Sequence, residues 1–429
     1  MQIPRPLAVA VVSLLAFAAR AEEPRPPLPR WAPSIEAGLA DAKARGQAFM
    51  VALNMDNEAG NQRMLDEVYT SEEFRAASQK CVVAVASLFQ HRLLPDAKSG
   101  ARVCERFGSV TCEQHRAIED VVRRQWLGRG PKDDVESPRH IFVAPNGKIL
   151  FQRVWTIEKE DLAALMLRAS ELCTPERLER WDTLEGRLER AIDPIASVRE
   201  IALGELIASD DPAVDGKLKE TLKSVKDPRI VGSVLAAFAA AGTPERRAIA
   251  HDGLTHKDPV VRTMVIHAMG RSGAADHLPL LLARAGKEKE TAPRASLYRA
   301  LGVLGKDDEA AAKAVRKGLG DSDETARANA FAAAAPWAAE KAVKSAARKV
   351  LVEGGSQEIR GIAVWLLGLS GDAGLVKTLE EYKSSIGRWD WKLTRAVDAA
   401  IAKLSGKDVP NYETYAAWLV QDPALSIAR

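Results

Sequence analysis

The sequence has almost no excess of charge of either sign. Its 61 Lys and Arg residues nearly balance 58 Asp and Glu residues, and the formal net charge at pH 7 is +3. Proteins that bind nucleic acid need a basic face to pair with phosphates, so we expect no nucleic-acid partner. Aromatic residues are also scarce, at 5%, whereas alanine is abundant. That combination suits helices that pack closely together.

Long apolar runs are missing beyond the start of the chain. The run at residues 7–19 follows Arg5 and ends at the small-residue sequence Ala-Arg-Ala of residues 19–21. It is too short to span a bilayer comfortably, and its flanks are typical of a secretory signal peptide rather than of an uncleaved anchor. We therefore assign residues 1–21 to a signal peptide, after which no cysteine follows to indicate a lipoprotein. We expect an exported protein, periplasmic or extracellular in a bacterium, with no membrane span after cleavage.

Cysteine is scarce as well. The four cysteines are Cys81, Cys104, Cys112 and Cys173, and no two of them form a C-x-x-C motif. An oxidising compartment permits disulfides between them. Cys81 begins an apolar stretch and is interpreted as a core residue, with a pairing to Cys173 as the open alternative.

Residues 22–30 are proline-rich and predict an extended linker. Helix-like and strand-like patterns then alternate over residues 31–173, and Ser34 and Gly46 are typical of the two ends of the first helix. The predicted order is helix (35–45), strand (48–55), helix (62–68), helix (from 71), strand (81–89), an irregular stretch with a helix near 114–126, strand (141–143), strand (149–155) and helix (158–172).

This order resembles that of thioredoxin-like domains. Trp31 and the alanine-rich first helix resemble the opening of exported members of that family. Residues 137–148, Ser-Pro-Arg-His-Ile-Phe-Val-Ala-Pro-Asn-Gly-Lys, are similar to the family segment TP-x-x-x-F-x-D-x-x-G-K. The resemblance implies an α/β domain in which Pro138 follows a cis peptide bond and faces the active site.

The activity of that family does not carry over. A working thioredoxin has C-x-x-C between its first strand and the next helix, where the helix N-terminus activates one thiol. The corresponding residues 54–62 hold no cysteine, so we expect no catalysis; an enzyme built on this fold would be a thiol–disulfide oxidoreductase. Asp56 and Glu58 in this segment either stabilise the helix start through its dipole or line a pocket.

Metal-ligating residue types gather in the irregular stretch instead. His91, Cys104, Cys112 and His115 offer four nitrogen and sulfur ligands within 25 residues, a set that suits Zn(II) and, through the thiolates, Cu(I). His140 is a further candidate for the same place. The spacing C-x7-C-x2-H matches no standard zinc finger, and two alternatives remain open. One is a Cys104–Cys112 disulfide that closes a short loop, and the other is a pair of separate structural thiols.

The C-terminal half has an internal period. An arginine is followed eleven residues later by a glycine in four pairs: Arg262/Gly273, Arg294/Gly305, Arg360/Gly371 and Arg395/Gly406. Arg199, Val231 and Arg327 share their phase, and successive anchors lie 31 to 35 residues apart. A period of this length indicates an array of helical hairpins, and residues 258–273 resemble the short HEAT-like, PBS-lyase-type repeat.

We accordingly predict an α/β domain followed by an α-solenoid. Residues 174–192 are assigned to a charged connecting helix, 193–406 to about seven hairpins and 407–429, with Tyr412, Tyr415 and Trp418, to a tail that caps the last repeat. By resemblance, the repeat arginines form a ladder with the capping Asp and backbone carbonyls of neighbouring units; the alternative is that they face a ligand.

An array of this kind usually presents a binding surface. Trp389 and Trp391 lie in a connection and are candidates either for anchoring a partner or for packing the terminal repeat. The sequence therefore predicts an exported, non-catalytic scaffold for protein–protein interaction, with an unidentified protein partner in the cell envelope and no cofactor. The alternative is a metal-binding or thiol–disulfide protein that uses Cys104, Cys112 and His115, with zinc or copper as its metal.

Overall fold

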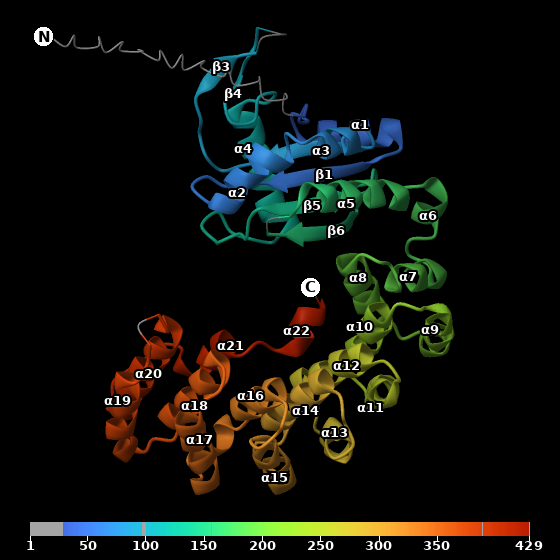
Figure 1. Cartoon of the computed structure of the whole chain (residues 1–429). Coiled ribbons are helices and arrows are strands. Elements are labelled where there is room, and N and C mark those ends of the chain that lie inside the picture. The colour runs from blue at the N-terminus through green and yellow to red at the C-terminus, as the bar shows by residue number, and fades with distance from the viewer. Residues whose placement is uncertain (1–28, 97–99, 156, 388, 429) are drawn as a thin grey trace, which may run out of the picture. The chain divides into compact units, whose positions relative to one another are not determined.

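The computed structural model describes residues 29–96, 100–155, 157–387 and 389–428 and divides the chain into two compact units, Met1–Leu178 and Glu179–Arg429 (Figure 1). The predicted signal peptide over residues 1–21 and most of the linker over residues 22–30 lie outside the described residues. Within the described ranges, no helix combines the length and the apolar character that a membrane span requires.

The first unit is built on a four-stranded sheet in the order β2-β1-β5-β6. β1 (Ala48–Leu53) runs parallel to β2 (Cys81–Ala86) and antiparallel to β5 (Arg139–Val143), which pairs antiparallel with β6 (Ile149–Val154). All six residues of β1 are apolar and buried, because helices cover both faces of the sheet. The Ser137–Pro138 peptide bond that leads into β5 is cis.

Helices are assigned to the two sheet faces by the alternation of the strand side chains. Ile141 and Val143 share a core with residues of α1 (Ile35–Arg45) and α4 (Cys112–Val121). His140, which precedes Ile141, lies on the opposite face with Tyr69 and Phe74. Phe74 belongs to α3 (Glu72–Ala77), which packs on α5 (Lys159–Leu172). The remaining helical segments here are α2 (Ala59–Arg63), which continues as a π-helical turn (Met64–Val68), and a second such turn (Val122–Trp126) after α4.

The stretch expected to be irregular, residues 91–137, contains a small second sheet. β3 (Leu93–Pro95) pairs antiparallel with β4 (Arg102–Cys104), and Leu93 lies opposite Cys104. The hairpin was not predicted because its strands are three residues long, which is too short to show a periodic pattern.

The two ends of α1 were predicted correctly, since Ser34 accepts a hydrogen bond from the Ala37 N–H and Gly46 has a left-handed backbone conformation.

The prediction of a single connecting helix over residues 174–192 was wrong. The structure has α6 (Pro175–Glu179) and then α7 (Leu184–Ala191), because Thr183 caps a new helix through the Gly186 N–H. A Cβ at Gly186 would lie 2.0 Å from the Arg180 carbonyl oxygen, so the chain folds tightly at this break.

The second unit is an array of helical hairpins whose first helices stack in order along the chain (Figure 1). Each of the seven predicted anchor positions lies in a first helix. The described residues form six complete hairpins and then α20 (Trp391–Leu404), which lacks a regular second helix. The pairs are α8 (Ala196–Ile207) and α9 (Ala213–Ser224), α10 (Pro228–Phe238) and α11 (Pro244–His251), α12 (Pro259–Ser272) and α13 (Leu278–Ala285), α14 (Thr291–Leu304) and α15 (Glu309–Gly318), α16 (Glu324–Ala333) and α17 (Lys341–Glu353), and α18 (Gln357–Leu369) and α19 (Val376–Ser384).

Two of the repeat arginines, Arg262 and Arg294, form a ladder that differs from the predicted one in the acid that they bind. Arg262 donates from Nε and Nη2 to the two carboxylate oxygens of Glu288 at 2.8 and 2.9 Å, and from Nη1 to the His256 carbonyl at 2.8 Å. Arg294 binds Asp321 in the same bidentate way, at 2.7 and 3.0 Å. Each of these acids lies just ahead of the next unit and is not its N-cap residue. Arg360, in contrast, does contact the N-cap residue of the next unit, Asp390, at 3.4 Å. The arginines therefore hold neighbouring units together.

The tail extends further than a cap of the last repeat. Tyr412 does pack there, since it accepts a 2.8 Å hydrogen bond at its carbonyl from the Trp365 indole and donates its hydroxyl to the Trp365 carbonyl. The chain then continues through α21 (Tyr415–Leu419), which lies on α18, to α22 (Pro423–Ala428), which contacts α12 and α14 (Figure 1). The C-terminal segment, residues 415–428, thus runs back along the first helices of the array.

Candidate functional site

The four predicted ligand residues lie together in the first unit. One ligand atom from each of His91, Cys104, Cys112 and His115 can be chosen so that all four lie within 4.8 Å of one another. Cys104, Cys112 and His115 are buried, and His91 is partly buried. The Cys104 sulfur lies 3.3 Å from Nδ1 of His91. The cluster is therefore a compact group of two nitrogen and two sulfur donors.

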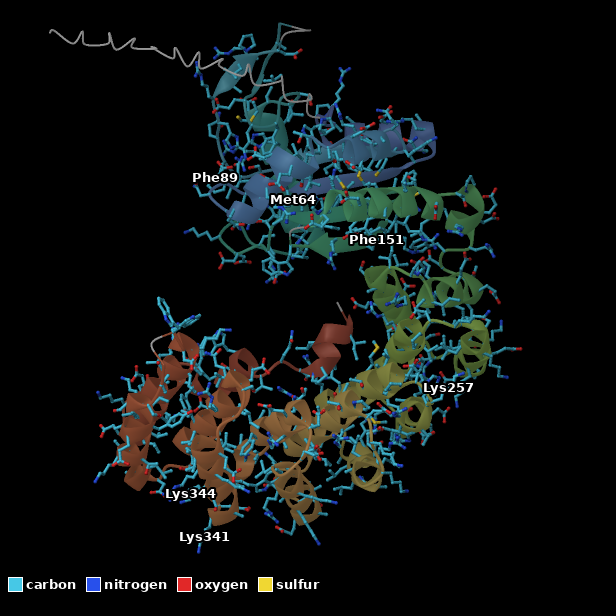
Figure 2. The ribbon with its side chains drawn as sticks, viewed as in Figure 1. Met64, Phe89, Phe151, Lys257, Lys341 and Lys344 are labelled. Atoms are coloured by element: carbon cyan, nitrogen blue, oxygen red, sulfur yellow. The ribbon has the colours of Figure 1, made fainter. Side chains whose placement is uncertain are left out.

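Local structure explains how residues so far apart in the sequence meet. Cys104 ends β4, and its N–H donates to the Val110 carbonyl at 2.8 Å across a tight turn. Thr111 then caps α4 in a reciprocal capping box with Gln114, so Cys112 begins the helix. His115 follows one turn later on the same face. The segment that carries His91 leaves β2 and includes Phe89, which Figure 2 labels.

Hydrogen bonds fix the orientation of both imidazoles. Nδ1 of His115 lies 2.9 Å from the Ser87 carbonyl, an acceptor, so Nδ1 carries the proton and Nε2 presents a lone pair. That Nε2 atom is buried and has no hydrogen-bond partner among the described residues. Nε2 of His91 lies 3.0 Å from the carboxylate of Asp56, which leaves Nδ1 to face Cys104.

The electrostatics of the cluster follow from its burial. Burial raises the pKa of Cys104 to about 11, and the neighbouring thiol of Cys112 adds to the shift. Burial also lowers the pKa of His115 to about 4, against the hydrogen bond to Ser87, with the nearby His91 adding to the lowering. The protein alone therefore favours a neutral Cys104 thiol and a neutral His115 imidazole.

All four cysteines are free thiols and buried in this structure. The Cys104–Cys112 disulfide alternative is thus not formed here, although both thiols belong to the cluster. Cys81 lies in β2 in the core, as expected, and the nearby thiol of Cys173 adds to the burial that raises its pKa. Neither Cys81 nor Cys173 belongs to the cluster.

The suggestion that His140 joins the same site was wrong. Its Nε2 lies 2.8 Å from the Tyr69 hydroxyl on the sheet face away from α4. A strand sends successive side chains to opposite faces, so it is Ile141 that faces the core beneath α4. Burial lowers the pKa of His140 to about 3, which keeps this imidazole neutral.

The two roles weighed for Asp56 and Glu58 were also incomplete. Glu58 is the N-cap residue of α2, so it does lie at the helix start, but its side chain makes no capping hydrogen bond there. Asp56 contacts His91 and Arg106, whose Nε lies 3.1 Å away. Glu58 accepts hydrogen bonds from Asn61 and from Ser137. The segment that would carry redox cysteines in a thioredoxin therefore holds a polar network.

Sequence reasoning did not identify Arg106 and Ser87 as neighbours of the cluster. The Arg106 guanidinium joins Asp56 to Asn54 and Gln62, with hydrogen bonds of 3.0 Å to both of the latter. Ser87 contacts His115 through its backbone alone: its carbonyl faces Nδ1, and its N–H donates to the His115 carbonyl at 3.2 Å. No side-chain pattern can reveal such contacts.

The aromatic candidates of the array have separate surroundings. Trp389 and Trp391 are 85% and 59% exposed, which keeps both accessible to a partner. The Trp391 ring lies 6.0 Å from that of Trp418 in the C-terminal segment, and Lys392 lies over both rings. Trp391 thus takes part in packing the end of the array while most of it remains exposed.

Comparison with known proteins bears on the second unit. No curated protein matches the chain. Residues 217–302 match the family model for HEAT repeats. This match includes three of the anchors, Val231, Arg262 and Arg294, and spans from α9 to α14. The helical-hairpin array of this chain therefore contains HEAT repeats.

Proposed function

We propose that the chain is an exported, non-catalytic scaffold that binds another protein through the first helices of its array. The observation that carries this proposal is the C-terminal segment, which already binds that surface. Arg299 of α14 donates to the Val420 carbonyl at 3.0 Å, and Nδ1 of His267 on α12 lies 3.1 Å from the Asp422 carboxylate. This face of α12 and α14, which we call the tail-binding face, thus recognises a polypeptide segment.

The bound segment also indicates what a partner would look like. It combines an extended residue, Val420, with an acid, Asp422, that begins a short helix. His267 and Arg299 supply the two groups that recognise the acid. A pocket of 260 Å³ lies beside the segment and leaves the exposed Val303 uncovered. A partner with an acidic, helix-forming end would therefore fit the same face.

The test is competition with the tail. A chain that ends at Gln421 loses Asp422 and α22 but keeps Leu419 and Val420, which belong to the array core. We expect a labelled peptide of residues 422–428 to bind this shortened chain and not the full chain. A matched peptide with Asp422→Asn should bind at least about tenfold more weakly, because a charge-assisted hydrogen bond is lost.

The envelope partner is then sought with the same reagents. The shortened chain should capture more of a specific envelope protein than the full chain, and the peptide should displace that protein. Trp389→Ala and Trp391→Ala test whether the exposed indoles contribute to the same capture. Failure of the peptide to bind, or enzymatic turnover in place of specific capture, would refute the scaffold.

The first unit is proposed to be a thioredoxin-like domain without redox activity. Its support is the sheet, in which β1 and β2 are parallel and β5 and β6 form an antiparallel hairpin beside β1. The segment after β1 holds Asn54, Asp56 and Glu58 and no cysteine. We expect no insulin-reducing turnover, and turnover abolished by Cys112→Ser would overturn this part of the proposal.

The proposal of export rests on the predicted signal peptide, residues 1–21, alone. Fractionation of cells that express the full chain should place it outside the cytoplasm with residues 1–21 removed. A chain that lacks residues 1–21 is the control and should remain inside.

A further inference from the structure

We infer that His91, Cys104, Cys112 and His115 bind one Zn(II) ion in a closed site that ties together three pieces of the insertion between β2 and β5. This goes beyond the scaffold function, because the site lies in the other unit of the chain. It rests on the donor set, the distances, the orientation of the imidazoles and the position of the ligands in the fold.

The donor set selects the metal. Two thiolates and two imidazoles in a tetrahedron are typical of zinc, whereas hard cations take oxygen ligands. Bonds of about 2.0–2.3 Å to a tetrahedral ion place the donor atoms roughly 3.3–3.8 Å apart. Cys104 and His91 already lie 3.3 Å apart, and the whole set lies within 4.8 Å. An ion therefore requires the donors to approach by no more than about 1.5 Å.

The imidazoles are arranged as metal ligands usually are. A ligating histidine commonly donates its other ring N–H to a carboxylate or a backbone carbonyl. His91 has Asp56 in that position and His115 has the Ser87 carbonyl. The ring nitrogens left over are Nδ1 of His91 and Nε2 of His115, and the latter is buried without a partner among the described residues. Burial of an unpaired polar atom is costly, and a metal bond would remove that cost.

The position of the ligands indicates a structural task. The four ligands come from the segment after β2, the end of β4 and the first turn of α4. One ion would therefore tie together three pieces of an insertion whose own sheet is only two short strands. Four protein ligands fill a tetrahedral site, which leaves no open position for a substrate.

The experiment measures metal in the full mature chain, purified without a polyhistidine tag and refolded with Zn(II) under reducing conditions. We expect about one zinc per chain by elemental analysis. The double variant Cys104→Ser/Cys112→Ser should retain less than a tenth of it. Cys173→Ala is the matched control, since it removes a buried thiol outside the cluster, and it should retain zinc fully.

A second measurement does not depend on variants that fold. Co(II) in the wild-type chain should give the intense d–d bands of a tetrahedral site and a thiolate-to-cobalt charge-transfer band. Modification of the thiols should release zinc in step with the loss of two reactive cysteines. A metal-free chain with a Cys104–Cys112 disulfide that persists under the reducing refolding, preference for Cu(I) with no zinc uptake, or zinc retained by the double variant would overturn the inference.

Discussion

Nδ1 of His267 on α12 lies 3.1 Å from the carboxylate of Asp422, a residue more than 150 positions later in the chain. Nε of Arg299 of α14 lies 3.9 Å from the same carboxylate oxygen. Burial opposes ionisation of Asp422, but the hydrogen bond with His267 and the charge of Arg299 outweigh it, and its pKa is lowered. The ionised form of Asp422 therefore holds the C-terminal segment to the array.

Asp422→Asn should loosen the C-terminal segment while the array stays folded. The variant keeps the size of the side chain and removes its charge, so we expect docking of residues 415–428 to weaken by about 1–3 kcal/mol. Hydrogen exchange of these residues should accelerate by roughly tenfold or more. Asp408→Asn, at an exposed position before the tail helices, is the control and should leave exchange unchanged. Equal exchange in both variants would contradict the role given to Asp422.

Glu288→Gln should reveal how much the arginine ladder contributes to stability. Burial opposes ionisation of Glu288, but hydrogen bonds from Arg262 and Arg284 outweigh it and lower its pKa to about 2. The variant leaves the buried Arg262 guanidinium without its counterion, so the free energy of unfolding should fall by about 3 kcal/mol at pH 7. Urea unfolding measures this, and the exposed Glu290→Gln is the control.

The same ion pair predicts a pH dependence. Because the folded-state pKa of Glu288 lies below its ordinary value of 4.5, its contribution is present in full above that value and is lost as the pH falls toward 2. The difference in unfolding free energy between wild type and Glu288→Gln should therefore shrink across this window. A difference that stays constant between pH 6 and pH 3 would show that the charge of Glu288 is not its source.

Gly368→Ala tests the packing of the tail on α18. A Cβ at this position would lie 1.9 Å from the Tyr412 hydroxyl oxygen and 3.0 Å from the Ala400 Cα, so the variant must displace Tyr412. We expect a loss of about 1–3 kcal/mol in stability, measured by thermal or urea unfolding. Gly204→Ala in α8 is the matched control, because its Cβ meets no atom within 4 Å among the described residues. It should raise stability by up to about 1 kcal/mol.

Asp56→Asn tests the residue that orients His91. An amide accepts the imidazole N–H more weakly than a carboxylate, so the zinc affinity of the cluster should fall by about 10–100-fold while the stoichiometry stays the same. Competition with a chelator measures this affinity. Asp41→Asn, on the surface of α1, should leave the affinity unchanged. An unchanged zinc affinity in Asp56→Asn would show that Asp56 does not orient His91 for metal binding.

The sequence was sufficient where structure is set locally. Ser34 and Gly46 end their helix as expected, and the repeat period places each anchor in a first helix. The period also predicted glycines at helix ends. Gly305 is one of these, but its φ of −105° is not left-handed. Glycine is required there because a Cβ would lie 2.3 Å from the Ala311 Cβ.

The sequence was insufficient where contacts depend on tertiary structure. It identified the four donors of the cluster, but their approach depends on a hairpin of two short strands and on the turn after Cys104. His140 was misplaced because its face is fixed by the register of β5 against β1, which no local pattern shows. The return of the tail to α12 was missed for the same reason, since His267 and Asp422 share no local signal.

The return of the C-terminal segment to α12 and α14 restricts how many hairpins the array can contain. The segment starts beside α18 and α20 and must reach His267 and Arg299, so its length matches the distance spanned by the intervening units. Repeat arrays ordinarily gain and lose units with little penalty, because each unit contacts only its neighbours. Here a unit added or deleted between α14 and α18 would move Asp422 out of register with its partners. The length of the C-terminal segment thus fixes the number of units between α14 and α18.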